Sequence, residues 1–367
     1  MDGHVAASAT APLIQGFDYV ELYVGNVRYA AHYFTTVWGF APLAYRGLEN
    51  GSRDRVSIVL RHGRSVIMLT GATDGSSPVS EYLRRHGEGV ATVALRVSDA
   101  EQMFSGAVSR GAVPVNEPRR VEDSAGEIVT GEVHSLEGFN HVFVERRAYS
   151  GGFGPGFISL ERAEKTKGSE TIVGLDHVAV CVEGGTLERW AQFYQDALGF
   201  VIGQREDVAT EYSGMNSLVV RDPLGNCKFP LVEPVPGRRK SQVQDFINYH
   251  GGCGVQHLAM ASADITKTVR DLRGNGVQFL GVPGSYYEGL EKRVGRLGRQ
   301  LDQFCELGIL VDRDDSGQLL QTFARPCVDR PTMFFEVIER RGASGFGGGN
   351  IRALFEAVER EQAARGA

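Results

Sequence analysis

Three residues of metal-binding types stand on apolar, strand-like segments in the second half of this 367-residue chain. They are His177 in GLDHVAV, His257 in GVQHLAM and Glu336 in MFFEVIE. Two imidazoles and one carboxylate form a facial ligand set for non-heme Fe(II), which leaves coordination positions open for a substrate and oxygen. The residue types and spacing therefore predict an iron site built from three separate strands.

Strand periodicity directs the three side chains toward an apolar interior. Alternate residues of a strand face the same side, so His177 shares a face with Ala179, His257 with Val255, and Glu336 with further apolar neighbours. A buried carboxylate without a partner costs several kcal/mol, and a divalent cation would satisfy it together with both imidazoles. The alternative, three unrelated core residues, fits any one of them taken alone.

The chain contains two copies of one unit. GFDYVELYV (16–24) corresponds to GLDHVAVCV (174–182), and the correspondence continues to VFVERR and EVIERR near the ends of the halves. Such self-similarity is typical of a duplicated fold. Each copy continues into an amphipathic helix that ends at Gly-Phe, and a later helix is predicted in each to begin after a capping residue, Asp99 or Asp264.

The first copy lacks the ligand set. Its residues at the three corresponding positions are Tyr19, Thr92 and Val142, and this trio would not bind iron well. We therefore expect the second half to carry the metal chemistry. The first half would serve as scaffold and oligomerisation surface, for which we consider a homodimer.

Length and composition favour a two-domain protein. The 42% hydrophobic content is typical of globular chains, the net charge of -6 is mild, and no basic patch indicates a nucleic-acid partner. We place an N-terminal domain at 1–150, a Gly-rich and charged linker at 151–170, and a C-terminal domain at 171–367. The beginning of the chain lacks the features of a signal peptide and no segment resembles a membrane span, so we expect a cytoplasmic protein without membrane association.

Several segments resemble the 4-hydroxyphenylpyruvate dioxygenase family of the vicinal-oxygen-chelate superfamily. They include KFPLVEPVPGRRKSQVQDF, GGCGVQHLA, LLQTFARPCVDRPTMFFEVIERRG and GFGGGNIRALFEAVEREQ, in family order and spacing. The resemblance implies an α+β fold of two tandem vicinal-oxygen-chelate domains. Each would pair two βαβββ modules into an open curved-sheet barrel, and a C-terminal helix would close the second. Fe(II) would bind His177, His257 and Glu336.

Two activities share this scaffold, and both use 4-hydroxyphenylpyruvate and O2. One gives homogentisate by attack on the ring; the other gives (S)-4-hydroxymandelate by hydroxylation of the benzylic carbon. The resemblance is to the hydroxymandelate-forming branch at Val232 and Ile351, where homogentisate-forming members carry Asn and Phe. Pro230 instead matches the homogentisate-forming members. With an aliphatic wall the substrate ring is freer to tilt away from the metal, and we therefore predict benzylic hydroxylation. The product would supply the synthesis of hydroxyphenylglycine for peptide antibiotics.

The resemblance also implies a set of substrate-binding positions. These are Ser217, Pro230, Val232, Gln242, Gln256, Gln321, Phe323, Asn350 and Ile351. Gln321 shares its predicted strand face with Phe323, so both side chains should enter the pocket together. Simpler roles stay open: Gln256 would only bond a neighbouring strand, and Asn350 would only cap the last helix. The glycine run 342–350 lacks a phosphate-loop pattern and instead indicates a hinge for that helix.

Three alternatives remain at this point. The first is the homogentisate-forming reaction on the same site. The second is a non-catalytic binding module of the same fold, which would not need the three inward ligands. The third is an extradiol ring-cleaving dioxygenase, which uses the same triad but not the segments around Gln242, Gln321 and the terminal helix.

Overall fold

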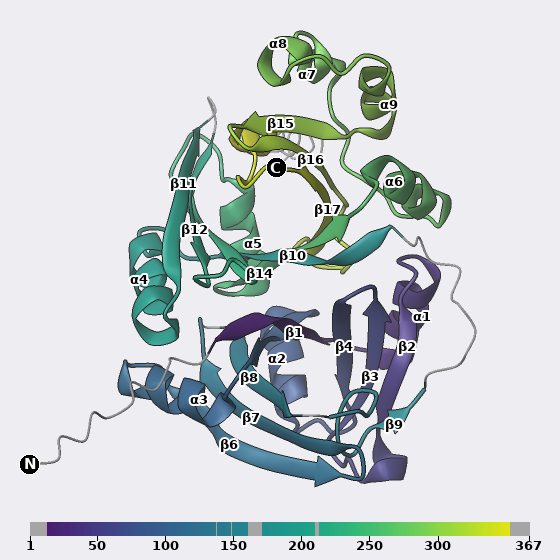
Figure 1. Ribbon diagram of the computed structural model, residues 1–367, viewed down its shortest axis with the longest axis vertical. Helices are drawn as coiled ribbons and strands as arrows, with labels where there is room; N and C mark the ends of the chain where they lie inside the picture. The colour runs from purple at the N-terminus through teal and green to yellow at the C-terminus, as the bar shows by residue number, and fades with distance from the viewer. Residues whose placement is uncertain (1–12, 137, 148, 161–170, 210–212, 353–367) are drawn as a thin grey trace, which may run out of the picture.

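The protein is built from two strongly curved sheets that lie one above the other in Figure 1. The computed structural model describes residues 13–136, 138–147, 149–160, 171–209, 213–352. Its first sheet has the strand order β6-β7-β8-β5-β1-β4-β3-β2-β9 and its second has β11-β12-β13-β10-β14-β17-β16-β15. The predicted tandem arrangement of open barrels is therefore confirmed.

Each sheet consists of two βαβββ modules. The strands of the first sheet are β1 (Ile14–Tyr23), β2 (Ala41–Arg46), β3 (Arg55–His62), β4 (Ser65–Ala72), β5 (Gly89–Val97), β6 (Pro114–Asp123), β7 (Gly126–His134), β8 (Asn140–Arg147) and β9 (Ile158–Ser159). The strands of the second sheet are β10 (Ile172–Cys181), β11 (Val201–Ala209), β12 (Gly214–Arg221), β13 (Lys228–Val235), β14 (Gly254–Ser262), β15 (Leu310–Asp314), β16 (Gly317–Phe323) and β17 (Phe334–Arg341). In both sheets the two modules join through the antiparallel pairing of their first strands, β1 with β5 and β10 with β14.

The helices cover the outer faces of these sheets and fill the connections. They are α1 (Val27–Thr36), the 3-10 turn η1 (Leu48–Asn50), α2 (Pro78–His86), α3 (Ala100–Ser109), α4 (Leu187–Leu198), α5 (Gln242–His250), α6 (Ile265–Gly274), α7 (Gly284–Tyr287), α8 (Leu290–Val294) and α9 (Gln300–Leu307). Asp99 and Asp264 cap α3 and α6 as predicted, each accepting a hydrogen bond from the backbone N–H three residues on. Within the described residues, no helix combines the length and apolar character that crossing a bilayer requires.

The predicted linker needs a correction at its beginning. Phe153 packs against Tyr19 inside the first barrel, and β9 extends the first sheet by pairing with β2. Phe153 is buried as a linker residue would not be, and the main-chain pairing of β9 makes residues 158–159 part of the first sheet. Residues 161–170 lie outside the described part of the chain.

Apolar side chains from both halves form one continuous core. Trp38 and Phe34 of the first half contact Phe335 of the second, with ring centroids 4.5 and 5.8 Å apart. Phe17 meets Phe229 edge to face at 5.6 Å. The two barrels are thus held by packed aromatic groups rather than by chain connectivity alone.

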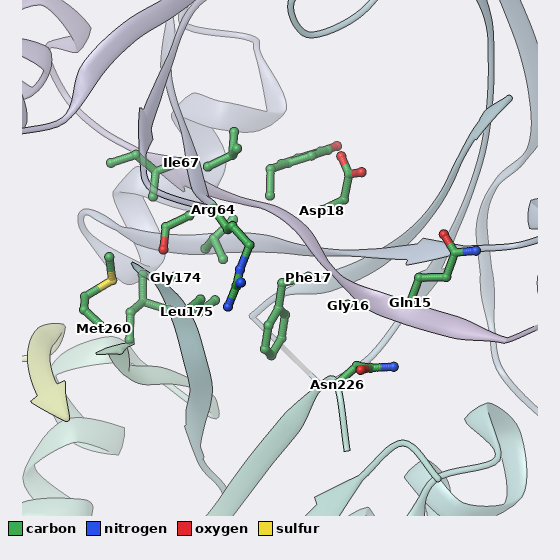
Figure 2. A pocket seen from close by; sticks show the side chains of 15 residues that line it. Gln15, Gly16, Phe17, Asp18, Arg64, Ile67, Gly174, Leu175, Asn226 and Met260 are labelled. Atoms are coloured by element: carbon green, nitrogen blue, oxygen red, sulfur yellow. The ribbon is translucent and has the colours of Figure 1, made fainter. Parts of the chain in front are cut away.

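A cavity of about 270 Å³ also lies between the two halves. Phe17 and Arg64 project into it from the first half, and Leu175 and Asn226 line it from the second (Figure 2). The Asn226 amide spans the junction by donating a hydrogen bond of 3.0 Å to the Ile14 carbonyl. None of the residues predicted for the functional site lines this cavity.

Candidate metal centre

The three predicted ligands meet inside the second barrel. Their donor atoms all lie within 4.8 Å of one another. The Glu336 Oε2 atom is 3.3 Å from Nε2 of His177 and 3.3 Å from Nε2 of His257. Both His177 and Glu336 are almost completely buried, at 2% and 1% exposure. Buried imidazole and carboxylate groups that converge in this way suit a divalent metal ion, and the donor set is the one expected for non-heme Fe(II).

Strand pairing produces this convergence. Residue His177 on β10 lies opposite Ala259 of β14, and Glu336 on β17 lies opposite the same Ala259 from the other side. The remaining ligand, His257, stands two residues before Ala259 and on the same face of the strand. The alternating pattern of the sequence thus brings together side chains that are 79 or more residues apart.

A β-bulge orients each histidine. The pairing of β10 with β14 skips Asp176 on one strand and Gln256 on the other, so each lies in an irregular step next to a ligand. Their side-chain oxygens lie 2.9 Å from His177 Nδ1 and 3.2 Å from His257 Nδ1. A hydrogen bond to Nδ1 fixes the ring and presents Nε2 to a metal. Gln256 therefore does more than bond a neighbouring strand.

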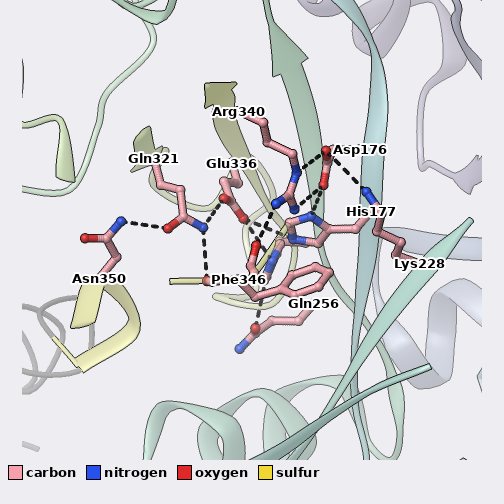
Figure 3. Close-up of polar contacts among 11 residues, drawn as sticks. Asp176, His177, Lys228, Gln256, Gln321, Glu336, Arg340, Phe346 and Asn350 are labelled. Atoms are coloured by element: carbon pink, nitrogen blue, oxygen red, sulfur yellow. Dashed lines mark hydrogen bonds and ion pairs between the residues drawn. The ribbon is translucent and has the colours of Figure 1, made fainter. Parts of the chain in front are cut away.

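An ion pair behind His177 holds its orienting carboxylate. Arg340 donates hydrogen bonds of 2.7 and 2.8 Å to the two oxygens of Asp176, and Lys228 Nζ lies 3.9 Å from it (Figure 3). Although burial opposes ionisation, Arg340 and His177 hold the pKa of Asp176 far below its usual range. The carboxylate is charged and fixed before any metal binds.

A chain of hydrogen bonds leads from Glu336 through two amide side chains to Tyr286 of α7. Gln321 Nε2 donates to Glu336 Oε1 at 2.8 Å, and Asn350 Nδ2 donates to Gln321 Oε1 at 2.8 Å. The chain continues to Tyr286, whose hydroxyl lies 2.7 Å from Asn350 Oδ1. Asn350 thus contacts Gln321 rather than the cavity itself. The network leaves Glu336 Oε2 free to face the histidines (Figure 3).

Electrostatics in the centre favour ionised Glu336 and neutral His257, which are the forms that bind a metal, but also favour a proton on His177. Burial raises the cost of ionising Glu336, but the two neighbouring imidazoles outweigh it and hold its pKa at about 2. Burial lowers the pKa of His257, whereas Glu336 and Asp176 overcome burial and raise that of His177. A cation placed between these groups would replace the proton that the three ligands otherwise share.

Eleven of the twelve predicted site residues line one cavity beside the triad, with Asn350 as the exception. Five further residues complete its wall: Glu206, Met215, Val219, Val243 and Phe346. Glu206 and Phe346 could not be predicted because β11 and the glycine-rich segment carry no clear apolar periodicity, whereas Met215, Val219 and Val243 are apolar residues that resemble ordinary core positions of β12 and α5. The free space is about 60 Å³, below the roughly 300 Å³ at which ligand pockets usually begin, so rim side chains must shift to admit an aromatic substrate.

The rim is formed by the segment that precedes the terminal helix. Phe346 lies against His177 with ring centroids 5.2 Å apart, and Arg340 stacks over Phe346 at 5.1 Å. Gly347 has a positive φ of 74°, and a Cβ there would overlap Gln321 Oε1. Residues 348–352 begin a helix, whereas the predicted apolar face at residues 354–358 lies outside the described part of the chain.

The first barrel contains the same positions without the ligands. Tyr19 and Val142 both lie opposite Ala94, as His177 and Glu336 lie opposite Ala259, and Thr92 takes the place of His257. This register confirms the predicted correspondence of the two halves. The salt bridge is kept: Arg146 donates to both oxygens of Asp18, as Arg340 does to Asp176.

The fold and site together define a duplicated vicinal-oxygen-chelate protein with a candidate metal centre in its second barrel. Residues 10–147 match the model of the hydroxyphenylpyruvate dioxygenase N-terminal domain. Residues 174–321 match that of the glyoxalase, bleomycin resistance protein and dioxygenase superfamily. These matches assign a related domain to each half.

Full-length relatives narrow the assignment. The chain is 38% identical to 4-hydroxyphenylpyruvate dioxygenase of Yarrowia lipolytica over 96% of this chain and 93% of that one. It is 37% identical to the enzyme of that name from Dictyostelium discoideum, over 96% of this chain and all of that one. A solved mutant of 4-hydroxymandelate synthase from Streptomyces coelicolor superposes with a TM-score of 0.86 at 35% identity, covering 95% of this chain and 99% of that one. The chain belongs to the 4-hydroxyphenylpyruvate dioxygenase family.

Proposed function

We propose that this protein is a 4-hydroxymandelate synthase. It would convert 4-hydroxyphenylpyruvate and O2 into (S)-4-hydroxymandelate and CO2 with Fe(II) held by His177, His257 and Glu336. Bound Fe(II) would supply oxygen activation coupled to oxidative decarboxylation of the keto acid. The atoms balance, because one oxygen atom of O2 would enter the new carboxylate of hydroxymandelate and the other its benzylic hydroxyl, while the original carboxyl group of the keto acid leaves as CO2.

The chain's own residues would determine which carbon is oxidised. Val232 and Ile351 both belong to the apolar wall of the cavity and pack in the same cluster as Met215 and Val243. This wall is the single observation that carries the proposal. Aliphatic side chains neither stack on a ring nor hydrogen-bond it, so the aromatic ring can turn away and leave the benzylic carbon nearest the metal. A displacement near 1 Å is enough to change such an outcome.

Other residues would bind and protect the substrate. Phe323 lies near His257, with ring centroids 6.4 Å apart, and offers an aromatic surface on the metal side of the cavity. Phe346 and the segment that follows it would close the rim and exclude water. Gln321, fixed between Glu336 and Asn350, would keep the carboxylate ligand in one orientation.

Identification of the product tests the proposal. Purified protein loaded with Fe(II) is incubated with 4-hydroxyphenylpyruvate under air, and the products are separated by chromatography. We expect hydroxymandelate and one CO2 per O2 consumed. Homogentisate as the main product would overturn the assignment.

The second candidate function is the homogentisate-forming reaction. Two observations favour it: Pro230, which matches that branch, lines the cavity, and the curated relatives at 36–38% identity carry the dioxygenase name. A non-catalytic binding role has less support because it would leave three buried ligands without a purpose. Oxygen uptake that depends on both iron and the keto acid would exclude it.

A further inference from the structure

Glu206 brings an unused hydrogen-bond acceptor into the cavity wall. Among the described residues, its Oε2 is one of two buried side-chain oxygens or nitrogens without a hydrogen-bond partner, the other being Ser65 Oγ. The second carboxylate oxygen, Oε1, accepts a hydrogen bond of 2.6 Å from Gln204 Nε2. A buried acceptor left empty costs about 1–3 kcal/mol, so a partner from a bound ligand would recover that energy.

Strand register places this carboxylate away from the metal. Glu206 on β11 lies opposite Ser217 of β12, which lies opposite Val232 of β13, which in turn lies opposite Cys181 of β10. These residues form one row across four strands. Because the metal ligands come from β10, β14 and β17, Glu206 stands at the far end of that row from the triad.

The surroundings of Glu206 at this end are mostly apolar. The cavity that Glu206 lines also has the apolar residues Met215, Val219, Val232, Val243 and Ile351 in its wall. The Ser217 hydroxyl already donates its hydrogen to the Glu206 carbonyl at 3.0 Å, so it is committed to the backbone. Burial, with a further contribution from Asp312, raises the pKa of Glu206 to about 7. The carboxyl is therefore poised to exchange hydrogen bonds with a neutral polar group.

We propose that Glu206 binds the para-hydroxyl of the substrate ring through Oε2 and thereby selects a phenol over an unsubstituted phenyl ring. This inference rests on the proposed function, because it requires the keto acid end of the substrate at the metal. The ring hydroxyl is at the opposite end of the substrate from the keto acid, so it would lie where the row from Cys181 to Glu206 ends. A site that hydrogen-bonds a hydroxyl rejects the analogue that lacks it, since its own polar group would stay unpaired.

A comparison of two substrates distinguishes recognition of the ring hydroxyl by Glu206 from a general loss of activity. The kcat/KM values of Glu206→Leu and Glu206→Gln are measured with 4-hydroxyphenylpyruvate and with phenylpyruvate. The leucine variant should lose roughly ten- to hundredfold with the hydroxylated substrate, mainly through KM, and less than about threefold with phenylpyruvate. The glutamine variant keeps a hydrogen-bonding group and should lie between the wild type and the leucine variant.

The matched control is Asp207→Asn, which removes an acidic charge from the exposed neighbour on the same strand. It should leave the ratio of the two substrates unchanged. Equal losses with both substrates in the leucine variant, or no change with either, would overturn the assignment of Glu206.

Binding without turnover gives a second readout. Anaerobic calorimetric titration of the Fe(II)-loaded protein compares the affinities of the two keto acids. The preference of the wild type for the hydroxylated acid should disappear in Glu206→Leu, and a preference that persists would refute the role. This result does not depend on the product. A protein that makes homogentisate but loses its phenol preference in the variant would overturn the proposed function and keep the inference.

Discussion

At the residue scale, the cavity has two aliphatic side chains, Val232 and Ile351, at positions where Asn and Phe would hold the substrate ring by a hydrogen bond and by stacking. Val232 lies on β13 opposite Ser217, and Ile351 packs on the same cluster from the beginning of the terminal helix. Neither side chain can form a hydrogen bond with the metal ligands. Their effect on the product must therefore come through the orientation of the ring.

The double variant Val232→Asn, Ile351→Phe tests this orientation. The amide and the aromatic ring should hold the substrate ring toward the metal, so homogentisate should appear beside hydroxymandelate. Product ratios are measured by chromatography with equal iron loading. Val219→Ile, a conservative change elsewhere on the same wall, serves as the control. A double variant with the product mixture of the wild type would show that these two positions do not steer the ring.

The sequence was informative about residues wherever periodicity was strong. The three ligands stand on apolar strands, so their faces and their counterparts Tyr19 and Thr92 in the first half could be assigned from spacing. Glu206 and Phe346 could not, because an edge strand and a glycine-rich segment impose no regular burial. The pair of Asp176 and Arg340 carried a usable signal, since both residues recur in the first copy.

At the element scale, the insertion in the second half supports the metal centre. The insertion consists of α7, α8 and α9, which lie between α6 and β15, whereas the described residues 110–113 between α3 and β6 of the first half form no helix. The hairpin of β15 and β16 around Asp315 and Ser316 corresponds to that of β6 and β7. Tyr286 of α7 reaches both Asn350 and the backbone of Val311. The inserted helix α7 thus supports the beginning of the terminal helix. A sequence pattern could not reveal this contact because it is formed by the polar ends of two side chains.

Removal of one hydroxyl tests this support. Tyr286→Phe leaves Asn350 Oδ1 without its donor, and we expect kcat to fall about tenfold, the equivalent of one buried hydrogen bond. Iron content, measured by metal analysis, should stay at one per chain because the ligands are untouched. The control is Tyr29→Phe, at a tyrosine that is 78% exposed. Unchanged kinetics in Tyr286→Phe would contradict the supporting role of α7.

At the scale of the whole molecule, buried histidines join the two halves. His141 of β8 lies 3.0 Å from the Tyr194 hydroxyl of α4, and its other nitrogen lies 3.1 Å from the Val93 carbonyl. His86 of α2 lies 2.8 Å from the His250 carbonyl of α5. These roles could not be predicted from the sequence, because a contact between domains leaves no periodic pattern.

These histidines predict weaker stability in acid. Burial lowers the pKa of His141 to about 4, and burial together with His86 lowers that of His250 to about 4. Unfolded histidine titrates near ~6.5, so between these values the unfolded chain binds more protons than the folded one. The free energy of unfolding should be level above about pH 6.5 and fall as the pH drops toward 4, by roughly 3 kcal/mol for each histidine.

Urea unfolding of the metal-free protein at pH 7 and pH 5 measures this loss. His141→Asn should reduce the difference between the two pH values, whereas His32→Gln, at an exposed position, should not. A variant at His141 with the full pH dependence of the wild type would show that acid acts elsewhere.

The salt bridge shared by both barrels bears on whether the fold needs a metal. Asp18 and Arg146 are joined in a barrel that holds no ligand set, so the pair is maintained for the backbone it braces and not for a metal. The shape of such a barrel therefore does not require a cation. In this chain the first barrel has Tyr19, Thr92 and Val142 where the second has its three candidate ligands, yet it keeps the same strand register and the same salt bridge.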